Sequence, residues 1–267
     1  VLAVANSYDG TTTVTGGTLR VLDAQALGVG DGTAATETIL NGGSLVLGAG
    51  LTMPAGERLH ATGPGDAYSY LTGEGAGSTW GGDVLLEAAS GYSLYLDLQG
   101  TLTIQGAIVD AGSGVNQLST NGSATLNDDV AVDYLSVGYY SSLFVNANTT
   151  VTTGFYGNYS STITIANATL STPSLYSYYS NLVLDHGVLS YTTLLYGYPM
   201  MTWSGHGTVQ DGDTFLVQDV SPGRSAGQSG VLESNNVSLY GSFTADLAGS
   251  TAGEGAGQHD QLQVHGT

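Results

Sequence analysis

Short runs in which inward apolar positions alternate with other residues recur along the whole chain. In the centre they are Leu143–Val145, Ile163–Ile165 and Leu182–Leu184. A period of two with many β-branched residues is typical of short β-strands, and the Gly, Asn, Asp, Ser and Thr between the runs suit turns. No window combines a 3.6-residue period with helix formers and caps, so we predict an all-β chain. Similar modules lie at 18–21, 44–47, 93–96, 101–104, 214–217 and 261–264.

An internal repeat covers residues 154–201. The segments 154–161, 174–181 and 194–201 align at a spacing of 20 residues, and the segments that follow them align at 19. Like residues therefore fall into rows, as expected for units that stack on one another. The rows are Leu135, Phe155, Leu175 and Leu195; Tyr156, Tyr176 and Tyr196; and Tyr159 with Tyr179.

The spacing of the repeat favours a solenoid over a set of hairpins. Antiparallel hairpins need turn signals every 8–12 residues or so, whereas a solenoid aligns like residues at the full period of a coil. We therefore predict a parallel β-helix (β-solenoid) with coils of about 19–25 residues, which gives about 12 or 13 coils. We expect one continuous domain over residues 1–267.

The two ends and the first half of the chain carry recognisable motifs. The segment Asn6–Val21, followed by 26–28 and 40–47, resembles the autotransporter-associated β-strand repeat of bacterial surface proteins. Segments 78–82 and 100–108 are similar to the middle coils of that family, and 243–247 with 259–266 to its closing coils. The resemblance implies a secreted or surface-displayed right-handed β-helix, and it supplies no catalytic residues. Since the chain opens and closes within a repeat, we expect a segment or one tandem unit of a longer protein.

The charge of the chain excludes several classes of partner. The chain has only 3 basic side chains (Arg20, Arg58 and Arg224) and 22 carboxylates, which gives a formal net charge of −19. So few cations cannot form a basic surface, which excludes nucleic-acid binding and attraction to anionic membranes. The longest apolar stretches are only a few residues, so no membrane insertion is expected. The absence of Cys excludes disulfides and thiolate metal sites, and suits an extracellular protein.

Two clusters of carboxylates are candidates for catalytic groups. A β-helical hydrolase or lyase needs paired carboxylates, one of them protonated, and Arg or Lys to hold an acidic sugar. Asp128, Asp129 and Asp133 form one cluster and Asp211 with Asp213 the other, but no arginine is near either in sequence. We interpret these aspartates as turn residues at coil corners, with calcium bridging as the alternative, and we expect no catalytic residues and no enzyme.

The histidines predict no metal or cofactor site. None of the five shows metal-ligand spacing, and no nucleophile elbow or phosphate loop is present. His186 and His206 are 20 residues apart, so we expect them to lie together at a turn as a solvated pair rather than as a two-ligand site. Candidate N-glycosylation sequons start at Asn121, Asn148, Asn158, Asn167 and Asn236.

Tyrosine is the most distinctive residue of the centre. Between residues 134 and 198 lie 11 of the 17 tyrosines, and Asp185 is the only formally charged side chain there. Stacked tyrosines are by default structural, since each ring covers its neighbour while the hydroxyl meets water. The functional interpretation is a contact surface for lateral association or glycan binding. Its candidate residues are Tyr156, Tyr176, Tyr196, Tyr159 and Tyr179.

These observations predict a non-enzymatic structural or adhesive β-solenoid, extracellular or on a bacterial surface. Its expected partners are further copies of itself, or surface glycans. Unpaired strands at the ends of a solenoid pair with other chains unless capped, and head-to-tail stacking builds a filament. The alternatives are a glycan-binding or glycan-degrading β-helix, and a passive spacer that presents another domain.

Overall fold

The computed structural model describes residues 1–195, 201–223, 228–247, 251–252 and 258–266. Every regular element in this part of the chain is a β-strand, and every pairing between these strands is parallel. The predicted all-β solenoid is thus confirmed. No helix within the described ranges is long and apolar enough to cross a membrane. The chain divides into two compact units, Val1–Ser136 and Val137–Thr267.

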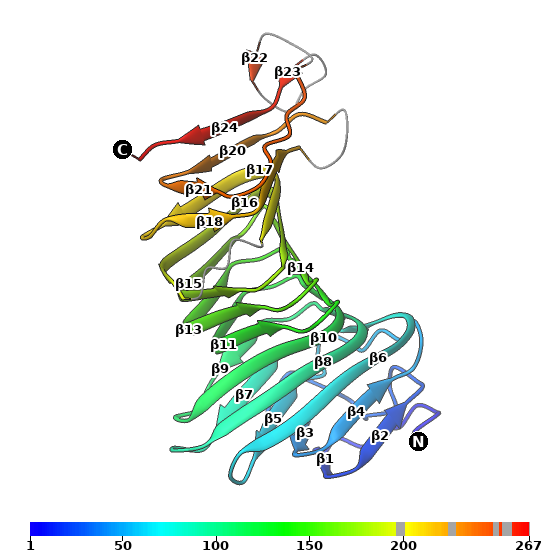
Figure 1. Ribbon diagram of the computed structural model, residues 1–267. Helices are drawn as coiled ribbons and strands as arrows, with labels where there is room; N and C mark the ends of the chain where they lie inside the picture. The colour runs from blue at the N-terminus through cyan, green and yellow to red at the C-terminus, as the bar shows by residue number, and fades with distance from the viewer. Residues whose placement is uncertain (196–200, 224–227, 248–250, 253–257, 267) are drawn as a thin grey trace. The chain divides into compact units, whose positions relative to one another are not determined.

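In the first unit the strands form two parallel stacks. One stack contains β1, β3, β5, β7, β9 and β11, and the other contains β2, β4, β6, β8 and β10 (Figure 1). The strands are β1 (Thr12–Thr15), β2 (Thr18–Val21), β3 (Thr38–Asn41), β4 (Ser44–Leu47), β5 (Leu59–Gly63), β6 (Ala67–Trp80), β7 (Val84–Ala88), β8 (Ser93–Ile104), β9 (Ile108–Asp110), β10 (Val115–Leu126) and β11 (Val130–Val137), which ends at the unit boundary.

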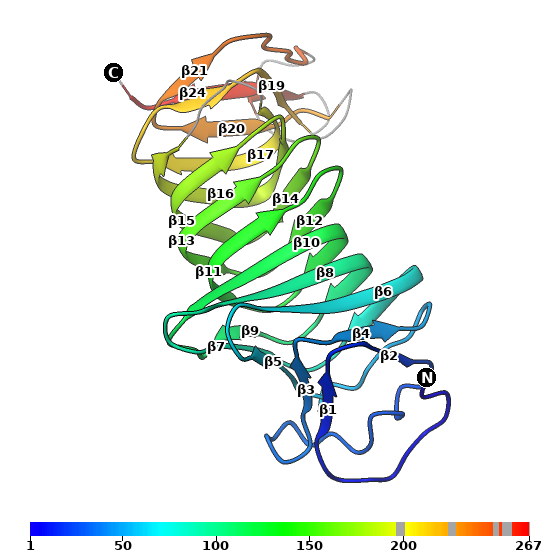
Figure 2. The same cartoon turned by 60° about the horizontal axis from the view of Figure 1, so that its bottom comes forward.

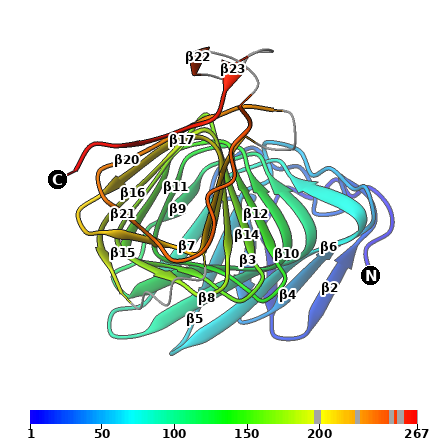
Figure 3. The same ribbon diagram turned by 45° about the horizontal axis from the view of Figure 1, so that its top comes forward.

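The second unit also stacks its strands in parallel, and its first turns are shorter. Figure 2 shows β12, β14 and β16 side by side, and β16 is long enough to pair with both β14 and β15. The pair β22–β23 lies apart from the stacked strands of this unit (Figure 3). The strands are β12 (Ser142–Val145), β13 (Thr149–Gly157), β14 (Thr162–Ala166), β15 (Thr169–Ser177), β16 (Asn181–Leu194), β17 (Thr202–Asp211), β18 (Phe215–Val217), β19 (Asp219–Pro222), β20 (Val231–Ser234), β21 (Val237–Leu239), β22 (Thr251–Ala252), β23 (Gln258–His259) and β24 (Gln261–Val264).

The alternation of the sequence sets which side chains point inward. In β4 the buried residues are Leu45 and Leu47, and Leu45 continues through Leu71 to Leu98 in the next two turns. In the second unit Ile163, Leu182 and Trp203 form an equivalent column, each 1% exposed or less. Because the strands are parallel and in register, each turn adds its apolar side chains to the core of its own unit.

The length of the turns differs from the prediction. Paired positions are 26 residues apart at Thr12 and Thr38, and 27 at Ala67 and Leu94, whereas Thr162 and Asn181 are 19 apart. The solenoid therefore has about 9 turns, and the expected 12 or 13 is wrong. The spacing of 20 was measured on the central repeat, and the first unit has longer loops between its strands.

Candidate functional site

The predicted rows of the central repeat are confirmed over one turn and slip in the next. Phe155 pairs with Leu175 and Tyr156 with Tyr176. Leu175 then pairs with Leu194, so the placement of Leu195 in this row is wrong by one residue. The turn from Leu175 to Leu194 takes 19 residues, one fewer than the turn from Phe155 to Leu175. Tyr196, the third member of the tyrosine row, lies outside the described residues.

Tyr156 and Tyr176 form a stacked pair on the side of the second unit. Their ring centroids are 4.4 Å apart and their planes differ by 11°. Both side chains are half-buried, so each ring covers the other and only part of each face meets solvent. This geometry is that of a structural ladder.

The more exposed tyrosines lie one corner further along the chain, just before β12, β14 and β16. At this corner Tyr140, Ser160 and Tyr179 occupy equivalent positions with φ of 56°, 54° and 52°. The left-handed conformation is uncommon outside Gly, Asn and Asp, and here it recurs turn after turn. Backbone bonds hold the corners together: Tyr140 N–H donates to the Tyr159 carbonyl and Ser160 N–H to that of Tyr179.

The rings of this corner are in mutual contact. Tyr140 meets Tyr159 edge-on at 5.9 Å, Tyr159 lies 5.1 Å from Tyr179, and Tyr178 meets Tyr179 edge-on at 4.8 Å. Exposure ranges from 37% for Tyr159 to 76% for Tyr140. The composition of the central segment had indicated such a surface, but only the register shows which rings form it. We call it the tyrosine corner: Tyr139, Tyr140, Tyr159, Tyr178 and Tyr179.

A hollow of about 430 Å³ adjoins the tyrosine corner. Two aromatic rings, two amides and two hydroxyls line it: Tyr159, Tyr179, Asn181, Gln218, Ser160 and Thr202. Thr202 Oγ1 donates to Asn181 Oδ1 at 2.5 Å, which fixes the orientation of that amide. The described lining thus combines aromatic faces with oriented, uncharged polar groups.

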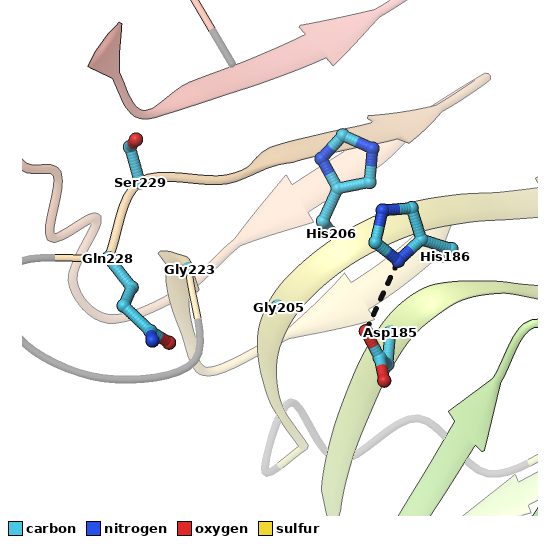
Figure 4. Close-up of a pocket in the computed structure, with 7 residues that line it drawn as sticks. All are labelled: Asp185, His186, Gly205, His206, Gly223, Gln228 and Ser229. Atoms are coloured by element: carbon cyan, nitrogen blue, oxygen red, sulfur yellow. Dashed lines mark hydrogen bonds and ion pairs between the residues drawn. The ribbon is translucent and has the colours of Figure 1, made fainter. Parts of the chain in front are cut away.

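A second hollow, of about 230 Å³, surrounds the two central histidines. His186 and His206 have ring centroids 4.9 Å apart, which confirms that they lie together in neighbouring turns. In Figure 4 the two imidazoles lie side by side and Gln228 and Ser229 line the far side of the hollow. His186 Nδ1 is 3.2 Å from Asp185 Oδ1. Among the described residues no group of three His, Cys, Asp or Glu is placed to hold a metal ion.

The carboxylates of the candidate aspartates accept hydrogen bonds from backbone N–H groups at turns. Asp211 is buried and its carboxylate accepts from Ser234 Oγ and from the amides of Asn235 and Asn236. Asp213 caps Thr214 N–H, and Asp128 caps Asp129 N–H. These contacts agree with the interpretation of the aspartates as corner residues.

Asp133, the third member of the first cluster, contacts residues of the neighbouring turn. Its carboxylate accepts from Asn116 N–H and contacts the side chain of Asp110. Burial, followed by the charge of Asp133, raises the pKa of Asp110. Asn116, fully buried, also donates to Asp110 and accepts from Ala88 N–H, so the group pins one corner of the first unit.

A further ionisable group that the sequence did not indicate lies on β5 and β7 and just before β3 and β5. Glu37 is 3.3 Å from Arg58 and 3.1 Å from His60, and His60 Nε2 is 2.7 Å from Glu87. Glu57, beside Arg58 in sequence, is only 1% exposed and accepts from Thr38 Oγ1. Burial raises the pKa of Glu57 to about 7. The spacings between these residues in the sequence are unequal, so their proximity follows only from the register of the strands.

Two of the sequon asparagines already use their side-chain amides in the structure. Asn158 Nδ2 donates to the Val137 carbonyl, and Asn121 Nδ2 donates to Asp97. Glycosylation at either would replace one of the two hydrogens on that nitrogen. Asn167, in contrast, is exposed at a left-handed turn position with φ of 52°.

Comparisons with known proteins give no match: no family model, no curated protein and no solved structure is similar to this chain.

Proposed function

We propose that this chain is a non-enzymatic structural and adhesive β-solenoid of a bacterial surface or an extracellular fibre. The observation that carries the proposal is the tyrosine corner, in which five tyrosines from successive turns gather and are 37% to 76% exposed. Tyrosine is enriched at protein interfaces because a large apolar ring carries a polar hydroxyl. A solenoid repeats such a corner from turn to turn, so that one contact surface is extended along the stack.

Charge supports the same surface as the place of contact. The whole chain carries −19, but Asp185 is the only formally charged side chain between residues 134 and 198. Two copies repel one another through their acidic parts, and this repulsion is weakest where the uncharged tyrosine corner faces its partner. The location rests on the resemblance of Asn6–Val21 to surface-protein repeats and on the absence of Cys.

Sedimentation velocity of the 267-residue chain tests lateral association. Added salt shortens the Debye length from about 30 Å at 0.01 M to about 8 Å at 0.15 M, so we expect self-association to increase with salt. Replacing Tyr139 and Tyr178 by Ser and Tyr140 by Asn, which tolerates the left-handed conformation, should leave the chain monomeric. The control removes an exposed ring of the first unit, Tyr68, which is stacked on Tyr95. If the corner variant associates as the parent does, the corner is not the contact surface.

End-to-end stacking is a second mode of assembly that the strand pairing favours. Strand β24 pairs with β20 along one edge, and β1 pairs with β3, while no described strand lies along the other edge of either. An uncovered edge pairs readily with another strand, and head-to-tail contacts between copies do not close, which produces a filament. Electron microscopy at high protein concentration should show linear particles. Particles of monomer length only, with light scattering of a monomer at every salt concentration, would exclude this mode.

A further inference from the structure

We propose that the hollow beside the tyrosine corner binds a short segment of an uncharged saccharide. This inference deepens the proposed function, on which it rests, by naming the ligand class of an adhesive surface. The hollow is lined by corner residues 159, 160 and 179, by the first residues of β16 and β17 (Asn181 and Thr202), and by Gln218. Its volume of about 430 Å³ lies within the usual range of sites for small ligands, about 300 to 1,000 Å³.

The aromatic part of the lining suits one face of a sugar ring. A pyranose presents a flat face of C–H groups and a rim of hydroxyls, so it packs against an aromatic ring while its edge stays polar. Tyr159 and Tyr179 are 37% and 38% exposed, and their rings, 5.1 Å apart, are tilted by 58° to one another. Two rings at this angle provide two walls of a cleft rather than one flat platform.

The polar part of the lining suits the hydroxyl rim. Asn181 and Gln218 each offer an amide, which both donates and accepts, and Ser160 and Thr202 offer hydroxyls. The amide of Asn181 is held by Thr202, which donates to its oxygen, and by a 3.4 Å contact of its nitrogen with Thr162 Oγ1. Holding the amide in place before the ligand arrives lowers the entropy lost on binding.

Serine at position 160 leaves room for the ligand. The equivalent corner positions of the preceding and following turns carry Tyr140 and Tyr179, whereas Ser160 between them has no ring. A third tyrosine there would continue the aromatic row over the hollow. Ser160, which lines the hollow between these two turns, therefore covers less of it than a tyrosine would.

Charge restricts the ligand to uncharged sugars. The described lining contains no Asp, Glu, His, Lys or Arg, and the nearest carboxylate along the chain, Asp219, is directed to Ser242. Uronic acids, sulfated sugars and phosphates need a cation to replace their hydration, and the described lining offers none. The net charge of −19 further repels such anions.

Saturation-transfer NMR on the 267-residue chain tests the proposal directly. The probes are short oligosaccharides of glucose, mannose, xylose, galactose and N-acetylglucosamine at millimolar concentration, with oligogalacturonate as the charged control. We expect transfer to at least one uncharged oligosaccharide and none to oligogalacturonate. Absence of transfer to every uncharged probe, or equal transfer to the anionic one, would overturn the proposal.

Three variants locate the binding. Tyr159→Ser removes one wall and Gln218→Leu removes an amide at nearly constant size, and each should weaken binding about tenfold, the factor that about 1.4 kcal/mol of lost contact represents. Tyr139→Ser is the matched control, since Tyr139 belongs to the tyrosine corner, is 67% exposed and does not line the hollow. Unchanged circular dichroism and melting temperature show that each variant is folded. Equal weakening in the control and in Tyr159→Ser would place the sugar elsewhere.

The outcome separates this inference from the proposed function. Loss of self-association on changing Tyr139, Tyr140 and Tyr178, with no sugar bound by the parent, would overturn the saccharide site alone. Sugar binding that depends on Tyr159 and Gln218, in a chain whose association does not depend on the corner, would overturn the proposed lateral contact alone.

Discussion

The backbone amide of Val231 donates a hydrogen bond of 3.0 Å to Nδ1 of His206. The ring nitrogen must be unprotonated to accept it, so this contact fixes the neutral tautomer with the proton on Nε2. Through it β20 is connected to β17 beside their backbone ladder, in which Gly207 pairs with Leu232. The histidine is thus first of all a support for the turn that enters β20.

A pair of substitutions at His206 tests this role. Asn places its Oδ1 close to the position of Nδ1 and can accept from Val231, whereas Phe fills the same space without an acceptor. We expect His206→Asn to change the free energy of unfolding little and His206→Phe to lower it by about 1 kcal/mol. Hydrogen exchange of the peptide that contains Val231 should be faster in the Phe variant only. Equal exchange in the two variants would show that the acceptor is unimportant.

Glu57 predicts a dependence of stability on pH in the first unit. Burial raises its pKa from 4.5 to about 7, so between these values the folded chain holds a proton that the unfolded chain has lost. The contribution of Glu57 to stability is therefore highest below pH 4.5 and falls as the pH rises to about 7, by about 3 kcal/mol at most. Urea unfolding at pH 5 and pH 8, followed by tryptophan fluorescence, measures the change.

The matched variants for Glu57 are Glu57→Gln and Asp9→Asn. Gln keeps an oxygen for the hydroxyl of Thr38 but does not ionise, so the stability of this variant should exceed that of the parent by more at pH 8 than at pH 5. Asp9 is exposed, and its replacement should leave the pH dependence as it was. If Glu57→Gln falls with pH as steeply as the parent, the buried carboxyl is not its cause.

The sequence predicted strands more accurately than contacts between turns. The modules at 18–21 and 44–47 coincide with β2 and β4, because each strand must alternate to bury one face. The register depends instead on the number of residues in each loop, which does not affect the burial of the strands. The row was therefore misplaced at Leu195, and the contact of Asp110 with Asp133 was not foreseen.

The tyrosine corner shows the same limit at the candidate site. Tyr159 and Tyr179 were predicted from their shared spacing, and the structure places their rings together. Gln218 lies two turns of the solenoid beyond Tyr179, in a segment that does not match the central repeat. Its place in the hollow could therefore not be derived from the sequence. A site on a solenoid is predictable only as far as its period is constant.

Gly100 tests how closely the turns of the first unit approach one another. It has φ of +70°, and a Cβ there would lie 2.1 Å from the carbonyl oxygen of Gly73. Gly50 has the same φ but no atom within 4 Å of an added Cβ. We expect Gly50→Ala to cost about 1 kcal/mol for the backbone conformation and Gly100→Ala about 2 to 3 kcal/mol more for the contact. Urea unfolding that gives equal losses would mean that the stacked turns can separate at no cost.

Substitutions at Asp211 and Asp213 test the structural role of the carboxylates of the second unit. Asp211 accepts three hydrogen bonds from residues 234–236, and an Asn side chain would turn its amide hydrogens toward one of these donors. Asp211→Asn should therefore lower the free energy of unfolding by about 2 kcal/mol, as followed by urea unfolding and tryptophan fluorescence. Asp213 is exposed and caps one amide, so Asp213→Asn should stay within about 0.5 kcal/mol of the parent. An Asp211→Asn variant as stable as the parent would remove the structural explanation for this buried carboxylate.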